Sequence, residues 1–354
     1  MKKIVVIGAG VIGASIAYYL AKAGADVLIV DSQSAVGGVA TPNSWAWINA
    51  SWGNPEPYAK LRMRSMQEWR GLRDVHPNLA VNWCGGLLWD LPQNELVKIA
   101  AIQKSLGYDV QVINGAAALK FEPALHLAPE LALYAAGEGS IEPVTATRGF
   151  LDAAETYGAK IMTNARVAGF CTTDRKVTGV HVAEHVYEAD EVVVAAGAQA
   201  PSLLAQLDVV LDLQAPPGLL VHSEPGPRLL NGLVMAPELH VRQTRDGRLV
   251  AGSDFGGTQP GDDPAATAGV LFQKVKTLLH GAEHLKMEFH TLGYRPTPKD
   301  GLPLIGRPSK VDGLYVAVMH SGITLAPAVG VFAAAEILRD ERDPLLLPFH
   351  VDRR

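Results

Sequence analysis

The residues with the clearest chemical meaning are glycines near the start of the chain. Gly8, Gly10 and Gly13 have the spacing G-x-G-x-x-G, directly after a short β-branched run and before a stretch of helical composition. In that context the first glycine permits a tight turn, the second lets the backbone approach a pyrophosphate, and the third allows the helix to pack closely on a sheet. Unpaired N–H groups at the start of the helix attract the anion. We therefore predict a dinucleotide site that includes Gly8, Gly10, Val11, Ile12 and Gly13.

Asp31 adds a second part of this predicted site. It follows the apolar run 26–30, which we expect to be a buried strand next to the first one. A carboxylate at the end of this strand accepts hydrogen bonds from the hydroxyls of a ribose and repels a 2′-phosphate. The pattern therefore disfavours NADP, and it fits FAD and NAD equally well.

Arg295 is the strongest candidate for contact with a substrate. It lies in the sequence Gly-Tyr-Arg-Pro-Thr-Pro of residues 293–298. A guanidinium presents a planar pair of donors that matches a carboxylate, so a bidentate pair would fix both the affinity and the orientation of an acidic substrate. A structural salt bridge is the alternative role for this side chain.

Four segments together resemble the D-amino acid oxidase superfamily of FAD-dependent enzymes, most nearly its branch of glycine oxidase, sarcosine oxidase and related amine dehydrogenases. They are the glycine fingerprint, residues 37–44, residues 191–204, and the C-terminal block of residues 293–306 and 320–327. The resemblance runs in order along the chain, although the segments between these four match only loosely. It implies non-covalent FAD, because the positions that carry a covalent link in some relatives have no cysteine or histidine here. It extends the cofactor site to Asp31, Ser32, Gly38, Ala40, Thr41, Val167, Ala195, Gly197, Arg295, Ser321, Gly322, Ile323, Thr324 and Leu325.

The same resemblance suggests roles for two histidines. His240 takes the position of a substrate-facing tyrosine of glycine oxidase, and strand alternation places Arg242 on the same face. His320 matches a histidine that precedes the flavin-contacting loop. Glycine oxidase has extra residues, including an arginine, between that histidine and the next Gly-Ile, whereas only Ser321 stands here. The missing arginine leaves space for a bulkier or secondary amine, and the predicted catalytic residues are Arg295, His240 and His320.

The resemblance implies oxidation of the C–N bond of a small amino acid or secondary amine, such as a D-amino acid, glycine, sarcosine or a proline-like compound. Hydride would pass from the α-carbon to flavin N5, and the resulting imine would hydrolyse. The expected partners are a small carboxylate-bearing amine and, as electron acceptor, dioxygen or an electron carrier. The alternative is a flavin-binding subunit of a hetero-oligomeric amine, opine or hydroxyproline dehydrogenase that needs a partner for electron transfer.

The apolar runs predict an α/β fold with a parallel sheet and a second, mainly antiparallel sheet. The resemblance implies that the first belongs to a Rossmann-type FAD-binding domain and the second to an α+β substrate domain. We expect the FAD-binding domain to be discontinuous, with residues 1–83, 140–210 and 293–354, and the substrate-binding domain to comprise residues 84–139 and 211–292. Strands are expected at residues 4–7, 26–30, 160–162, 166–170, 178–183, 186–188, 191–195, 239–243, 248–251 and 313–319. Helices are expected at residues 14–23, 150–157 and 327–339. Trp45, Trp47 and Trp52 are candidates either to wall the substrate pocket or to pack in the core.

Composition narrows the classes of function. The net charge is −5 and no lysine- or arginine-rich run is present, so we expect no nucleic-acid binding. Cys84 and Cys171 lie far apart, which argues against a disulfide framework or a cysteine metal site and fits the cytoplasm. The apolar segments are short or interrupted by proline, so we expect no membrane span. We expect no metal in the site, because His181 and His185 lie in a strand-like segment. A homo-oligomer is compatible with the sequence.

Overall fold

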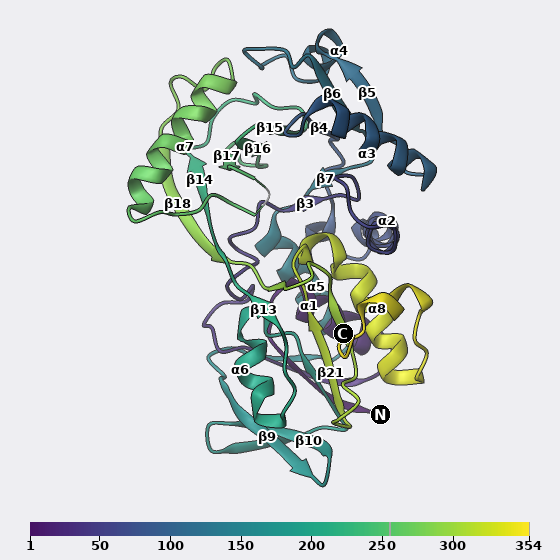
Figure 1. Cartoon of the computed structure of the whole chain (residues 1–354). Coiled ribbons are helices and arrows are strands. Elements are labelled where there is room, and N and C mark those ends of the chain that lie inside the picture. Colours follow the sequence, from purple (N-terminus) through teal and green to yellow (C-terminus); the bar gives the residue numbers. More distant parts are fainter. Residues whose placement is uncertain (255, 354) are drawn as a thin grey trace.

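The computed structural model describes residues 1–254 and 256–353, and its first large sheet lies in the lower half of Figure 1. Its strands are β1 (Lys3–Ile7), β2 (Asp26–Val30), β8 (Lys160–Met162), β12 (Glu191–Val194), β20 (Leu304–Gly306) and β21 (Leu314–Val318). The strand order is β20-β21-β12-β1-β2-β8, and all neighbours are parallel except β20 and β21. The residues of β12 and β21 are buried throughout, as expected of strands covered on both faces.

Helices pack closely around this sheet. The main ones are α1 (Val11–Lys22), α2 (Glu56–Gly71), α5 (Pro143–Thr156) and α8 (Gly322–Arg339). Helix α1 packs against both α5 and α8. A Cβ at Gly330 would lie 2.5 Å from Ser15 Oγ, so only glycine allows this approach of α8 to α1. The Ser15 hydroxyl completes the contact by donating to the carbonyl oxygen of Ala326 at 2.7 Å.

The second large sheet lies in the upper half of Figure 1 and has eight strands. They are β4 (Gly86–Leu88), β5 (Gln111–Asn114), β6 (Leu131–Ala135), β14 (Pro217–Ser223), β15 (Leu233–Ala236), β16 (Leu239–Gln243), β17 (Leu249–Gly252) and β18 (Met287–Tyr294). Their order is β18-β14-β17-β16-β15-β4-β6-β5, with β15 and β4 as the parallel pair among antiparallel neighbours. Helix α7 (Pro264–Leu278) packs on β14, β16, β17 and β18, and α3 (Gln93–Ser105) packs on β5 and β6.

Smaller elements connect the two sheets or extend from them. The strands are β3 (Trp47–Ile48) with β7 (Gly139–Ser140), β13 (Leu213–Gln214) with β19 (Thr297–Pro298), and the sheet of β9 (Val167–Thr173), β10 (Lys176–Val182) and β11 (His185–Glu188). The remaining α-helices are α4 (Gly115–Phe121) and α6 (Ala200–Leu204). Short 3-10 helices span Leu72–Asp74, Pro77–Leu79, Gly197–Gln199, Ala205–Leu207 and Pro344–Phe349.

The predicted α/β fold class is confirmed, and most predicted elements are found within two residues of their expected ends. The expected helix at 150–157 begins earlier, at Pro143, because proline suits the first position of a helix. The chain passes between the two large sheets several times, since β4 to β6 and β14 to β18 belong to one, whereas β1, β2, β8, β12, β20 and β21 belong to the other. The division into domains at the stated boundaries stays a prediction.

Helix α8 begins at Gly322, five residues before the expected start at Pro327. Proline inside a helix lacks the N–H that would bond the carbonyl four residues earlier, here that of Ile323. The indole Nε1 of Trp69 donates to this carbonyl oxygen at 3.0 Å and replaces the missing bond. Among the described helices, α8 is the one long and apolar enough to cross a membrane, but 72% of it is buried inside the protein. It is therefore a core helix here.

Candidate active site

A cavity of about 850 Å³ is lined by residues of both large sheets. From the first sheet its wall takes the carboxyl ends of β1 and β2, the turn after β12 and the first turn of α8, and from the second sheet it takes parts of β14 and β18. Ligands bind at the carboxyl ends of parallel strands in α/β folds, and cofactor pockets have volumes of about 300–1,000 Å³. The cavity therefore has the position and the size of a cofactor site.

Most residues that the sequence predicted for the cofactor line this cavity. They are Gly8, Gly10, Val11, Ile12, Asp31, Ser32, Gly38, Ala40, Thr41, Val167, Ala195, Gly197, Arg295, Ser321, Gly322 and Ile323. Gly13, Thr324 and Leu325 are not in the described wall, and Thr324 and Leu325 are fully buried. The Thr324 hydroxyl donates to the carbonyl oxygen of Trp47 at 2.9 Å, so it supports the wall from behind.

The glycine turn has the geometry that its spacing predicted. Gly8 has a φ of 105°, and a Cβ there would lie 2.5 Å from the carbonyl oxygen of Ala195. A Cβ at Gly13 would lie 1.9 Å from the carbonyl oxygen of Gly8, so α1 packs against the turn only with glycine. Gly10 differs, because the nearest atom to its Cβ position is Thr41 Oγ1 at 3.6 Å. The open side of Gly10 faces the cavity, where a pyrophosphate would approach the backbone.

Asp31 is buried at the cavity edge and shapes the same turn. Its Oδ2 accepts a hydrogen bond from the N–H of Ala9 at 2.7 Å, and its Oδ1 accepts one from the N–H of Gln33 at 2.8 Å. A carboxylate has about four acceptor positions. Each oxygen therefore keeps capacity to accept a bond from a ribose hydroxyl.

His320 lies at the cavity wall immediately before α8. Its Nε2 is 2.5 Å from the carbonyl oxygen of Gly301, and because a carbonyl only accepts, Nε2 carries the hydrogen. The Nδ1 atom then accepts from the Ser321 hydroxyl at 2.8 Å. Burial lowers the pKa of His320 to about 4, so the ring is neutral at physiological pH. His320 thus orients the start of α8 without adding charge to the site.

Arg295 follows β18 and lines the cavity half-buried. Burial lowers the pKa of its guanidinium, and the nearby Asp254 and Tyr58 oppose this shift. Arginine stays protonated in proteins, so the group is a fixed cation. A Cβ at Gly256 would collide with the guanidinium, so the absence of a side chain there leaves the space that Arg295 occupies.

His240 lies in β16, where it is 2% exposed. Its Nε2 is 2.9 Å from Oδ2 of Asp90, and its ring centre is 5.7 Å from that of Trp45. Trp45 lines the cavity, whereas His240 is not among the described residues of the wall. Arg242 pairs with Oε1 of Glu142 at 3.2 Å and is likewise outside the described wall. The structure therefore places His240 behind Trp45, where it contacts a wall residue.

Sequence reasoning missed Arg62, a buried cation of the cavity wall. This side chain is 5% exposed, and its Nε donates to the carbonyl oxygen of Asn49 at 3.0 Å. Nη1 donates to the Tyr58 hydroxyl at 3.2 Å, and Nη2 donates to Oδ1 of Asn49. These described partners are all neutral oxygen atoms. One feature of the sequence could have indicated Arg62: it lies on the buried face of α2, beside Leu61 and Ser65, where a charged residue is unexpected.

Two of the three tryptophans form part of the wall. Trp45 and Trp47 line the cavity, and Trp52 is not among the described lining residues. The Trp45 indole donates to the carbonyl oxygen of Val250 at 3.1 Å, and the Trp47 indole donates to Oε2 of Glu138 at 2.8 Å. These bonds fix the two rings as rigid apolar walls.

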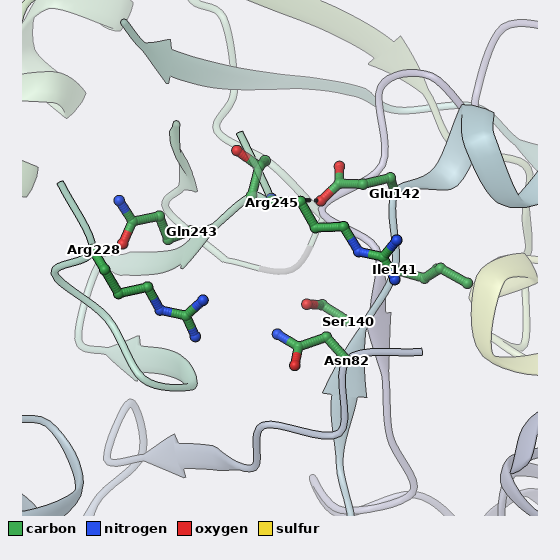
Figure 2. A pocket seen from close by; sticks show the side chains of 8 residues that line it. Asn82, Ser140, Ile141, Glu142, Arg228, Gln243 and Arg245 are labelled. Carbon is green, nitrogen blue, oxygen red and sulfur yellow. Dashed lines mark hydrogen bonds between the residues drawn. The ribbon is translucent and has the colours of Figure 1, made fainter. Parts of the chain in front are cut away.

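A second, separate cavity of about 20 Å³ shares no lining residue with the large one (Figure 2). Its wall consists of Asn82, Ser140, Ile141, Glu142, Arg228, Gln243, Thr244 and Arg245. A volume of this size holds about one water molecule. It is therefore too small for a dinucleotide.

Comparison with known proteins identifies the family of the chain. Residues 3–336 match the model of the family described as FAD dependent oxidoreductase, DAO. The chain belongs to the DAO family of FAD-dependent oxidoreductases. A glycine oxidase of Pseudomonas putida is 27% identical over 92% of this chain and 92% of its own. A D-amino acid dehydrogenase of Cereibacter sphaeroides is 26% identical over 97% of this chain and 92% of its own. The crystal structure of glycine oxidase from Geobacillus kaustophilus has a TM-score of 0.89 and 24% identity over all of both chains.

The residues of this FAD-dependent oxidoreductase fit FAD. The open face of Gly10 and the N–H groups at the start of α1 would hold the pyrophosphate, and Asp31 would hold the ribose. The first turn of α8 lines the cavity, and its N-terminus carries the positive end of a helix dipole. That end would favour negative charge on a bound isoalloxazine ring.

Proposed function

We propose that this oxidoreductase oxidises the C–N bond of a small amino acid or secondary amine whose carboxylate binds Arg295. One observation carries the proposal: the Arg295 guanidinium lines the same cavity as the glycine turn and the start of α8. A bidentate ion pair there would hold the substrate by its carboxylate and leave the amine-bearing carbon facing the cofactor. The names of the two relatives, glycine oxidase and D-amino acid dehydrogenase, describe substrates of this chemical class.

The charges of the site favour the reactive form of such a substrate. FAD, when bound, supplies the two-electron acceptor for the hydride of the α-carbon. The amine must be neutral, because its lone pair assists the departure of that hydride. Arg62 and Arg295 are cations and His320 is neutral, so these groups disfavour a protonated amine next to them, and the carboxylate of Asp254 beside Arg295 offsets part of this effect. The imine product then hydrolyses in water.

The wall also suggests the size of the substrate. A single residue, Ser321, separates His320 from Gly322, so no further arginine follows His320 in this loop. Trp45 and Trp47 provide apolar surface. This combination favours an α-substituted or secondary amine over glycine. His240 then serves as a positioning residue, because it is held by Asp90 and contacts the ring of Trp45.

We further propose that FAD is bound without a covalent link. Among the described residues of the cavity wall, His320 is the one histidine and no cysteine is present. The Nε2 of His320 already donates to the carbonyl oxygen of Gly301. The proposal includes dioxygen or an electron carrier as the acceptor, a homo-oligomeric or monomeric enzyme, and a cytoplasmic location.

The role of Arg295 is tested with the variants R295K and R295Q and with R73Q, which changes an exposed arginine, as the matched control. Loss of the bidentate pair should raise KM for the amine by about 100-fold, equal to about 2.7 kcal/mol, with bound FAD retained. R73Q should behave as the wild type. An unchanged KM in R295Q would show that the carboxylate binds elsewhere.

A further inference from the structure

A cluster of potential metal ligands lies in the second sheet region, away from the FAD cavity. Its residues are His126, His280 and Glu283, and their ligand atoms all lie within 4.8 Å of one another. None of them belongs to the described wall of the large cavity. They come from the segment after α4 and from the segment after α7, which are far apart in the sequence.

The backbone fixes the relative position of the two histidines. Leu125 and Leu279 form an isolated antiparallel bridge, flanked by hydrogen bonds from His126 N–H to Leu278 O at 2.9 Å and from His280 N–H to Ala124 O at 2.7 Å. Leu125 and Leu279 are buried in the core of this region. Because side chains alternate across an extended segment, both histidines point to the opposite, outer face.

Glu283 completes the cluster from the turn that follows His280. Its Oε2 accepts from the N–H of Gly281 at 2.8 Å, and its Oε1 lies 3.4 Å from Nε2 of His126. Its neighbours along the chain, Ala282 and Leu285, are buried, so this turn is anchored to the core. The carboxylate is thus held beside the histidines. A hydrogen bond from its own N–H, together with that of Gly281, lowers the pKa of Glu283.

The three side chains are close enough to reach one small metal ion after they rotate, since their ligand atoms all lie within 4.8 Å of one another. The ring centres of His126 and His280 are 3.6 Å apart. In a tetrahedral zinc site with bonds of about 2.0–2.1 Å, ligand atoms lie about 3.3 Å apart. The rotation of partly exposed side chains is sufficient to close the remaining gap, because the backbone already places all three. Two imidazoles and one carboxylate are a ligand set that zinc and similar borderline metals accept.

We propose that His126, His280 and Glu283 form a binding site for a divalent transition-metal ion of the zinc class, with water as the fourth ligand. The ion links the segment after α4 to the segment after α7 and so stabilises the second sheet region. This site is independent of the oxidation proposed above, since it shares no residue with the FAD cavity.

The test is a calorimetric titration of the FAD-loaded full chain with ZnCl₂, after treatment with a chelator, with H126A, H280A and E283Q beside the wild type. The wild type should bind one Zn²⁺ per chain and show a higher Tm with the metal present. Loss of one ligand should weaken binding by more than about tenfold, because even the removal of an outer-shell partner costs about 10- to 100-fold. H185A, which removes an exposed histidine of β11, is the matched control and should bind as the wild type does.

Two outcomes would overturn the proposal. One is the absence of saturable Zn²⁺ binding to the wild type. The other is an affinity that is equal in the wild type, H126A and H280A. The three variants change exposed or half-buried side chains, so the far-ultraviolet circular dichroism and FAD content should be unchanged in all of them.

Discussion

The indole Nε1 of Trp69 donates a hydrogen bond to the carbonyl oxygen of Ile323, the one that Pro327 leaves without its helical partner. Trp69 is almost fully buried and so holds the first turn of α8 at the cavity. We predict that W69F loses about 1–3 kcal/mol of unfolding free energy and binds FAD more weakly, because a buried carbonyl loses its donor. Chemical denaturation and FAD titration measure both effects. W89F makes the same change in a half-buried residue outside the described cavity wall; it should cost less stability than W69F and leave the FAD affinity unchanged, and equal behaviour of the two variants would contradict the role of Trp69.

Alanine substitutions distinguish Gly10, which faces the cavity, from Gly13, which packs against the protein backbone. In G10A the new Cβ meets no protein atom within 3.6 Å but enters the cavity, so the protein should fold and bind FAD at least about tenfold more weakly. In G13A the Cβ collides with the carbonyl oxygen of Gly8, so the fold itself should lose stability. G71A is the control, since nothing lies within 4 Å of its Cβ position. Thermal unfolding and FAD titration distinguish the variants, and full FAD affinity in G10A would refute the assigned position of the pyrophosphate.

Arg62 should affect catalysis through the wall residues that it binds. In R62K the charge remains, but the fork that binds the carbonyl and side-chain oxygens of Asn49 and the hydroxyl of Tyr58 is lost. We expect kcat/KM to fall by about tenfold or more, equal to about 1.4 kcal/mol. R73K changes an exposed arginine and should have wild-type kinetics. If R62K also has wild-type kinetics, Arg62 has no part in ordering the wall.

The lowered pKa of His320 predicts that the unfolding free energy depends on pH in the acid range. Its pKa is about 4 in the folded protein, because burial disfavours the charged ring, and is about 6.5 when unfolded. Between these values the unfolded chain binds more protons, so the unfolding free energy falls as pH decreases from about 6.5 towards about 4. The wild type loses on the order of 1–3 kcal/mol of unfolding free energy in this way, and H320N has no ionisable ring to lose it. The difference in unfolding free energy between the wild type and H320N should therefore shrink at low pH. Chemical denaturation of both proteins at several pH values measures this difference.

The matched control for this pH effect is H185N, at an exposed histidine. His222 also has a pKa lowered to about 4, but it is present in both proteins and cancels in the difference. A pH-independent difference between the wild type and H320N would mean that His320 is not buried in its neutral form.

Local sequence signals predicted the first half of the nucleotide-binding sheet well. The run of β1, the glycine turn and β2 are adjacent in the chain, and each has a composition that specifies one local structure. The eight-stranded sheet was predicted only in part, because β15 pairs with β4 from a distant segment and no local pattern records that pairing. The start of α8 was placed too late because Pro327 usually marks a helix start, whereas here Trp69 compensates for its missing N–H.

In the candidate site, too, local motifs were predictable from the sequence and long-range contacts were not. Most predicted residues of the glycine turn and of the start of α8 line the cavity, since their motifs fix the backbone, whereas Gly13, Thr324 and Leu325 are outside its described wall. Arg62 has no motif. Tyr58 lies one helical turn earlier in α2, but Asn49, which accepts two of the hydrogen bonds of Arg62, belongs to the segment after β3 and is brought to it only by the fold. His240 has the predicted strand position, but its partner Asp90 lies 150 residues away, and no local pattern shows that its ring lies beside Trp45 and outside the described cavity wall. The roles of Arg295, His240 and His320 stay predictions.

The central claim is that bound FAD is reduced by a small carboxylate-bearing amine. The most direct test is an anaerobic visible spectrum of the FAD-loaded protein during separate additions of glycine, sarcosine, D-alanine, D-proline and hydroxyproline isomers. We predict that at least one substituted or secondary amine bleaches the flavin band near about 450 nm, and that air or an added electron carrier restores it. A yellow protein that none of these amines bleaches would contradict the proposed reaction.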